Sequence, residues 1–110
     1  MIKVIMLMKR RPGMTISEFR DYYENNHRVI GEKYLNGFAV KYIRRFINPL
    51  IDRSGNLTDP EYDVLMEVWY PDEETFKACG EKLSEPEIAK EIKKDEEKIF
   101  DTRFMRSYTV

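Results

Sequence analysis

The order in which two hydrophobic periodicities alternate along these 110 residues limits the possible folds more than any other feature. Four short segments, residues 2–8, 38–47, 62–70 and 103–110, have the length and the β-branched or aromatic content of strands. Two segments, from 16 to about 30 and from 86 to about 98, instead repeat apolar residues every three or four positions, as helices do. The predicted order of the main elements is therefore β-α-β-β-α-β, with a short extra helix around Phe76 and Cys79.

Two four-residue patterns mark where the helices begin. Thr15 and Glu18 fit a capping box, in which the Thr15 hydroxyl accepts a bond from the amide of residue 18 and Glu18 reaches back. Ser84 and Glu87 fit a second box, with Pro86 in the first turn, where proline is favoured. Residues 48–60 contain Pro, Gly, Asn and Asp, and the length of this loop suggests a lid or a mobile edge.

This order of elements predicts one α+β domain over residues 1–110, with the ferredoxin-like arrangement of a four-stranded antiparallel sheet covered by helices on one face. The other face of the sheet still carries apolar side chains such as Leu65 and Trp69. A chain of this size that leaves so much apolar sheet in water is prone to aggregate. We therefore expect a homodimer in which two sheets pair face to face and form a dimeric α/β barrel.

Composition argues against several classes of partner. The 19 basic and 20 acidic residues leave a net charge of −1, which provides no field to attract nucleic acid. Cys79 is the only cysteine, so the chain has no internal disulfide. The apolar run at residues 1–8 is too short to span a membrane, and Lys9 to Arg11 follow it rather than precede it, unlike a signal peptide. We expect a soluble, cytoplasmic protein without membrane contact.

His27, the only histidine, is the residue best placed for chemistry. It lies one helical turn after Tyr23 and two after Phe19, on the apolar side that faces the sheet. Desolvation and a tyrosine hydroxyl can shift its pKa there, so it suits a general acid or base acting on a substrate between helix and sheet. A core histidine that only bonds a backbone carbonyl fits the same spacing, and the pattern does not separate the two.

Other polar residues offer supporting roles. Asp101, just before the last strand, suits either a group that orients the imidazole or a turn residue. Asp63 and Glu67 share a strand face and are expected to pair with Arg44 or Arg106 on neighbouring strands. One histidine, one cysteine and scattered carboxylates lack the spacing of metal ligands, so we expect no metal and no cofactor.

The chain resembles members of the EthD-domain family, within the dimeric α/β-barrel superfamily. Three stretches that together cover nearly the whole chain carry the resemblance: Lys9-Arg10-Arg11-Pro12-Gly13-Met14-Thr15 leading into Phe19, Tyr22-Tyr23 and His27; Tyr62-Asp63 with Glu67-Val68-Trp69-Tyr70; and Asp95-Glu96 to Phe100-Asp101. The loop from Asn48 to Pro60 departs from the pattern, because it is longer than the usual connection.

The resemblance implies a homodimer with a small-molecule pocket between sheet and helices. His27 matches the family's histidine at the end of the first helix, and Asp101 matches its late aspartate, so both are expected to be catalytic. The residues expected to contact the substrate are Tyr23, Tyr42, Arg44 and Trp69. Related families include polyketide-tailoring decarboxylases or dehydratases, lactone isomerases and proteins encoded beside ether-degrading oxygenases.

Two functions follow as hypotheses. In the first, the protein is a cofactor-free lyase or isomerase that transfers protons on an aromatic or polyketide-like carbonyl or carboxylate compound, by decarboxylation, dehydration or isomerisation. In the second, it is a non-catalytic binding protein or an accessory to an oxygenase pathway. A haem ligated by the single histidine is a third interpretation, which no other residue pattern favours.

Overall fold

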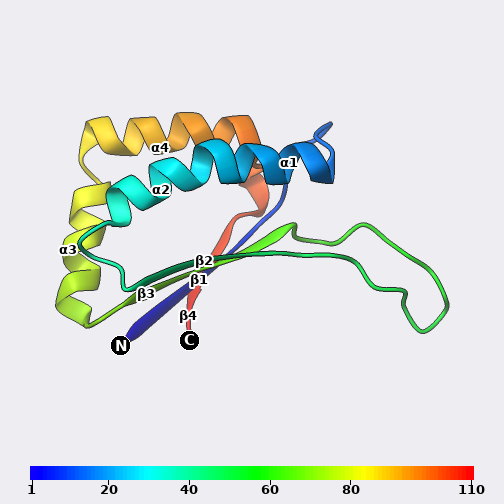
Figure 1. Ribbon diagram of the computed structural model, residues 1–110, viewed down its shortest axis with the longest axis horizontal. Helices are drawn as coiled ribbons and strands as arrows, with labels where there is room; N and C mark the ends of the chain where they lie inside the picture. Colours follow the sequence, from blue (N-terminus) through cyan, green and yellow to red (C-terminus); the bar gives the residue numbers. More distant parts are fainter.

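The molecule has two layers, a four-stranded sheet and a set of helices packed on one of its faces (Figure 1). The computed structural model describes residues 1–110. The elements are β1 (Ile2–Met8), α1 (Ile16–Tyr22), the π-helical turn η1 (Tyr23–His27), α2 (Arg28–Leu35), β2 (Lys41–Phe46), β3 (Val64–Tyr70), α3 (Glu73–Leu83), α4 (Pro86–Ile99), the 3-10 turn η2 (Thr102–Phe104) and β4 (Arg106–Thr109). The strands are antiparallel and lie in the order β2-β3-β1-β4, which confirms the predicted α+β, ferredoxin-like arrangement.

β1 has the predicted bounds, whereas the other three strands are shorter than the segments that the sequence predicted. β2 begins at Lys41 and β3 at Val64, while β4 is reduced to four residues because the turn η2 takes up residues 102–104. The register places Met6 of β1 and Arg44 of β2 on either side of Met66 in β3. Because side chains at alternate positions of a strand share a face, this register determines which residues of the three strands face the helices.

The first helix runs from α1 through η1 and α2 without a break in the chain direction. The Thr15 capping box forms as predicted: the Thr15 hydroxyl accepts from the Glu18 amide at 3.1 Å, and the Glu18 carboxylate accepts from the Thr15 amide at 3.2 Å. The helix continues past Gly31 to Leu35, whereas the sequence pattern predicted that it ends at about residue 30.

The second predicted capping box is wrong. Ser84 follows the end of α3, and its hydroxyl donates to the carbonyl of Gly80 at 2.8 Å instead of accepting an amide of α4. α4 starts with Pro86 at its first turn and has no side-chain cap. The start of α3 is capped, because the Asp72 carboxylate accepts from the Thr75 amide at 2.7 Å.

The core is divided into two clusters that lie at opposite ends of the helix–sheet interface. The first cluster joins α1 and η1 to the ends of β1, β3 and α4, and its buried members are Met8, Phe19, Tyr23, Val64, Ile99 and Phe100. The second joins α2 and α3 to β3, with Leu35, Val68, Tyr70 and Cys79. Because neither cluster fills the middle of the interface, a space remains between them.

An arm formed by residues 47–63, between β2 and β3, projects from one end of the sheet (Figure 1). Its base is held to the body by Arg10, whose guanidinium donates to the buried Asp63 carboxylate at 2.7 Å. The apolar residues exposed on the arm are Leu50, Ile51 and Leu57. The arm points away from the space between helices and sheet, so it does not have the position expected of a lid over that space.

The sheet face opposite the helices is uncovered (Figure 1). Trp69 lies on this face, with the ammonium groups of Lys3 and Lys41 4.1 and 4.4 Å from its ring centroid. The apolar side chains that share the face by strand alternation are Ile5, Leu7, Ile43 and Leu65. The apolar side chains of this face are therefore either exposed to solvent or covered by a partner.

The ion pairs on β3 differ from the predicted ones. Glu67 accepts from Arg45 at 2.6 Å, and Asp63 pairs with Arg10, so neither carboxylate contacts Arg44 or Arg106. The reason is strand alternation: Arg44 lies on the helix-covered face, opposite to Glu67.

Replacing Phe19 by alanine tests the first core cluster. Phe19 is fully buried and packs edge-on against Tyr23, Phe46 and Phe100. The free energy of unfolding in urea is expected to fall by about 3–5 kcal/mol, the usual cost of such a cavity. Val29→Ala, on the exposed side of α2, serves as the control and is expected to change it by less than about 0.5 kcal/mol. A loss below 1 kcal/mol for Phe19→Ala would contradict the assigned core.

Candidate functional site

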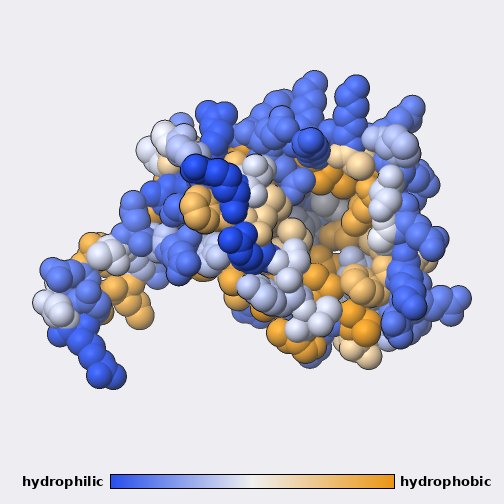
Figure 2. Space-filling model, turned by 180° about the vertical axis from the view of Figure 1, so that it is seen from behind, coloured by the Kyte–Doolittle hydropathy of each residue, from blue (hydrophilic) through white to orange (hydrophobic).

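A cavity of about 380 Å³ lies between the two core clusters, under α2 and α4 and over β1 and β3. This volume is at the small end of the range for ligand pockets, roughly 300–1,000 Å³. Figure 2 shows the hollow from outside, with hydrophobic residues along its walls. The 16 residues that line it, 13 of them hydrophobic, are Val4, Met6, Met8, His27, Ile30, Gly31, Tyr34, Leu35, Tyr42, Met66, Val68, Tyr70, Leu83, Ala89, Ile92 and Glu96.

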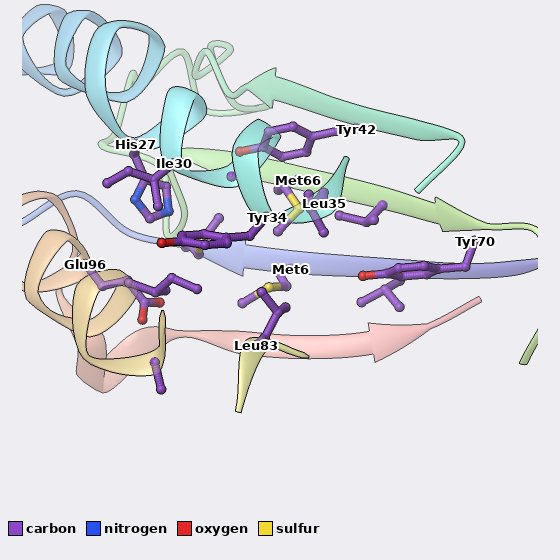
Figure 3. A pocket seen from close by; sticks show the side chains of 16 residues that line it. Met6, His27, Ile30, Tyr34, Leu35, Tyr42, Met66, Tyr70, Leu83 and Glu96 are labelled. Atoms are coloured by element: carbon purple, nitrogen blue, oxygen red, sulfur yellow. The ribbon is translucent and has the colours of Figure 1, made fainter. Parts of the chain in front are cut away.

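Three polar groups of the cavity lie at one end. His27, the Tyr34 hydroxyl and the Glu96 carboxyl lie together there, whereas Tyr70 and Leu83 lie toward the other end (Figure 3). A cavity with one polar end and an apolar body suits an amphipathic molecule, whose polar group is directed toward His27.

The π-helical turn η1 places His27 at the cavity. In this turn the amide of Arg28 bonds the carbonyl of Tyr23, five residues earlier, which widens the helix locally. The ring of His27 packs edge-on between Tyr23 and Phe100, with centroids 5.1 and 5.0 Å away. Single π-turns within α-helices occur often at functional sites, where they redirect a side chain.

Asp95 of α4 fixes the orientation of the imidazole. Its Oδ2 lies 2.8 Å from Nδ1 of His27, and its Oδ1 accepts from the Tyr22 hydroxyl at 2.6 Å. The side chain of Asp95 is 8% exposed and that of His27 is 13% exposed. Because a carboxylate only accepts hydrogen bonds, Nδ1 carries the proton, and Nε2 keeps its lone pair.

Burial lowers the pKa of His27 below its ordinary value of 6.5, and the bond to Asp95 opposes this shift only in part. The imidazole is therefore neutral at pH 7, which leaves Nε2 able to accept a proton. The unfolded chain binds a proton at this residue more readily than the folded chain does. His27 thus contributes stability above pH 6.5, and this contribution is lost as the pH falls from 6.5 through the lowered value.

The Asp95 carboxylate also accepts a hydrogen bond from the Tyr22 hydroxyl. Its burial and its hydrogen bond to Asp95 raise the pKa of Tyr22 to about 12, so the hydroxyl stays protonated and donates. Asp95 thus receives one hydrogen bond from α1 and one from η1, and both its oxygens are satisfied. A buried carboxylate with two such partners holds the imidazole in one tautomer and one orientation.

Four residues proposed from the sequence do not line the cavity: Asp101, Trp69, Arg44 and Tyr23. Asp101 caps η2, and its carboxylate accepts from the Arg103 guanidinium at 2.8 and 2.9 Å, so Asp95 and not Asp101 contacts His27. Trp69 lies on the uncovered sheet face, because strand alternation directs it away from Tyr70, which lines the cavity. Arg44 lies outside the wall, where it pairs with Glu24.

Two tyrosines proposed from the sequence come together beside the cavity. Tyr42 lines it, and its hydroxyl lies 3.4 Å from that of Tyr23, which is fully buried in the first core cluster. Burial raises the pKa of both hydroxyls, so both remain protonated. Tyr42 packs so close to α2 that a Cβ at Gly31 would lie 2.9 Å from its hydroxyl oxygen. The glycine is therefore what allows this approach.

Sequence reasoning missed Asp95 and Glu96, although the pattern contained a signal for the first. Asp95 continues the apolar stripe of α4 between Ile92 and Ile99, at the position where a fourth apolar residue would face the sheet. An acidic residue in such a stripe is buried and needs a partner, and the only histidine faces the same interface. Glu96, one turn after Ile92, lies at the edge of the same stripe.

No group of three or more His, Cys, Asp or Glu side chains in the structure is arranged to hold a metal ion. The Tyr22–Asp95–His27 cluster supplies one nitrogen and one carboxylate, and the carboxylate is already occupied. None of the helices has the length and apolar character needed to cross a membrane.

Comparison with known proteins places this geometry in a family. The family model described as EthD domain matches residues 11–103. A search of curated proteins gave no match. Similar solved structures include an EthD family protein from Bacillus halodurans, at 16% identity and a TM-score of 0.66 over 100% of this chain and 97% of that one.

Two further solved structures show the same fold. A protein from Bacteroides fragilis, described as dimeric, of unknown function and with a ferredoxin-like fold, is 14% identical with a TM-score of 0.61 over 99% of this chain and 93% of that one. A NIPSNAP-like domain protein from Burkholderia xenovorans is 19% identical with a TM-score of 0.59 over 99% and 82%.

The variant Asp95→Asn tests the link between Asp95 and His27. Loss of the carboxylate removes the interaction that holds the His27 pKa up against burial, so this pKa is expected to fall further below 6.5. Proton NMR of the imidazole measures the change directly, since the chain has one histidine. Asp101→Asn is the control and is expected to leave the titration unchanged. An unchanged or raised His27 pKa in Asp95→Asn would contradict the assigned contact.

Proposed function

The chain belongs to the EthD-domain family, and on that basis we propose that it is a cofactor-free enzyme that transfers protons on a small organic molecule. The observation that carries this proposal is the oriented, neutral His27–Asp95 pair at the polar end of an otherwise apolar cavity. A histidine oriented by a buried carboxylate is the arrangement that general base catalysis uses.

The proposed substrate is an aromatic or polyketide-like carbonyl or carboxylate compound. Its ring system would lie along Met6, Met66 and Tyr70, with its polar group at His27. Nε2 would remove a proton from the carbon next to the carbonyl, and the electron pair of that C–H bond would move onto the carbonyl oxygen. The imidazolium so formed would be stabilised by Asp95, and it would return the proton to another carbon in an isomerisation or to the departing hydroxyl, as water, in a dehydration. In a decarboxylation no C–H bond breaks: the electron pair of the C–CO₂ bond would move onto the carbonyl oxygen, and a proton taken up by Nε2 from solvent would go to the carbon after CO₂ leaves.

We also propose that two copies pair through the uncovered sheet face. The apolar residues around Trp69 on that face supply the driving force, and a protein of the same fold is described as dimeric. The cavity lies on the opposite side of the sheet, so pairing of this kind leaves its lining residues within one chain.

The variant His27→Gln tests catalysis. Glutamine keeps a hydrogen-bonding side chain of similar reach but has no titrating base, so turnover is expected to fall by roughly 100-fold or more. The assay follows exchange of the protons next to a carbonyl in D₂O by NMR, across a panel of aromatic ketones, lactones and phenolic acids. Asn26→Gln, exposed on the same turn, is the control.

Retained exchange in a folded His27→Gln variant would refute the assignment of the base. If the wild type binds a compound tightly and returns it unchanged after long incubation, the protein is instead a binding or accessory protein. That second function would use the same cavity but would not require the pKa of His27 to be shifted.

The proposed dimer predicts a mass of twice the 13.2 kDa chain in light scattering at micromolar concentration. Ile43→Glu places a charge in the apolar part of the uncovered face and is expected to give the monomer mass. Val29→Glu, at an exposed position on the helical layer, is the control and should leave the mass unchanged. A monomeric wild type would refute the pairing.

A further inference from the structure

The cavity wall contains one acidic residue and no lysine or arginine. Its 16 lining residues include Glu96 but no lysine or arginine, and the buried Asp95 lies directly behind His27. His27 itself is neutral, because burial lowers its pKa. A ligand that carried a negative charge would therefore enter an apolar space without a counter-charge, which is among the most costly arrangements in proteins.

The basic residues closest to this region are already paired outside the wall. Arg44, expected from the sequence to hold a substrate carboxylate, donates from Nε to Glu24 at 2.7 Å and stacks over the Tyr42 ring. Lys33 lies 3.8 Å from Glu91, whose carboxylate also accepts from the Tyr34 hydroxyl. Neither cation is among the lining residues.

Glu96 is the titratable group of the wall that the proposed mechanism does not use. It extends from α4 at the polar end of the cavity, near His27 and Tyr34 (Figure 3). Burial, and secondarily the neighbouring Asp95, raises the pKa of Glu96, and no side-chain hydrogen bond contributes to this shift. A carboxylate ligand bound at this end of the cavity would therefore lie beside an acidic group.

We propose that the cavity selects neutral carbonyl compounds over carboxylates, because its polar end presents the acidic group of Glu96 and no cation while His27 faces the carbon next to the carbonyl. This inference rests on the proposed function and narrows its substrate class: ketones, lactones and quinones fit, and free carboxylic acids do not.

The test compares two probes of nearly the same shape, 2-acetylnaphthalene and 2-naphthoate, whose binding to the wild type is measured by fluorescence at pH 7. The ketone is expected to bind at least about tenfold more tightly than the carboxylate. Glu96→Gln, which replaces the acidic group by an uncharged amide of the same length, is expected to retain ketone binding within about threefold and to tighten naphthoate binding by about tenfold. Glu97→Gln, exposed on the same helix, should change neither affinity.

A wild type that prefers naphthoate, or that does not bind the ketone, would overturn the proposal. An unchanged ratio of the two affinities in Glu96→Gln would overturn the role of Glu96. The ligand preference can be tested separately from the proposed catalysis. His27→Gln leaves Glu96 in the wall, so this variant is expected to keep the preference for the ketone even when it exchanges no protons. A wild type that prefers the ketone but exchanges no protons supports this inference and refutes catalysis.

Discussion

The hydrogen bonds of one buried carboxylate, Asp95, hold together the part of the molecule on which the candidate site depends. Asp95 is 68 positions from His27 in the chain, and its two oxygens tie α4 to α1 through Tyr22 and to η1 through His27. A buried charge is tolerated only with such partners, so the two long helices have one favourable relative position. The cavity lies under these helices, between the two core clusters.

Local patterns in the sequence predicted the elements, their order and the one histidine of the site, because helix and strand periodicities depend on near neighbours. They could not predict the partner of that histidine. Asp95 and Asp101 are both acidic residues late in the chain, and only the packing of α4 against α1 distinguishes the one that contacts His27 from the one that caps a turn. The position of Trp69, unlike the contact of Asp95, could be predicted from the sequence. Its place on the uncovered face follows from strand alternation.

Fold similarity to solved structures at 14–19% identity places the chain among ferredoxin-like proteins, and the function has to come from the site itself. Three features of the site agree with one another: a neutral, oriented imidazole, an acidic wall without cations, and an apolar body of limited volume. Together they describe a pocket for an uncharged molecule with one oxygenated end. The arm of residues 47–63, with its exposed apolar side chains, takes no part in this pocket.

The measurement that tests this account most directly is a long-range nitrogen–proton NMR correlation spectrum of the His27 ring at pH 7. It reports which ring nitrogen carries the proton, and the single histidine makes the assignment unambiguous. The account predicts a neutral ring protonated at Nδ1 and unprotonated at Nε2, as the bond to Asp95 requires. A doubly protonated ring, or a neutral ring protonated at Nε2, would contradict it.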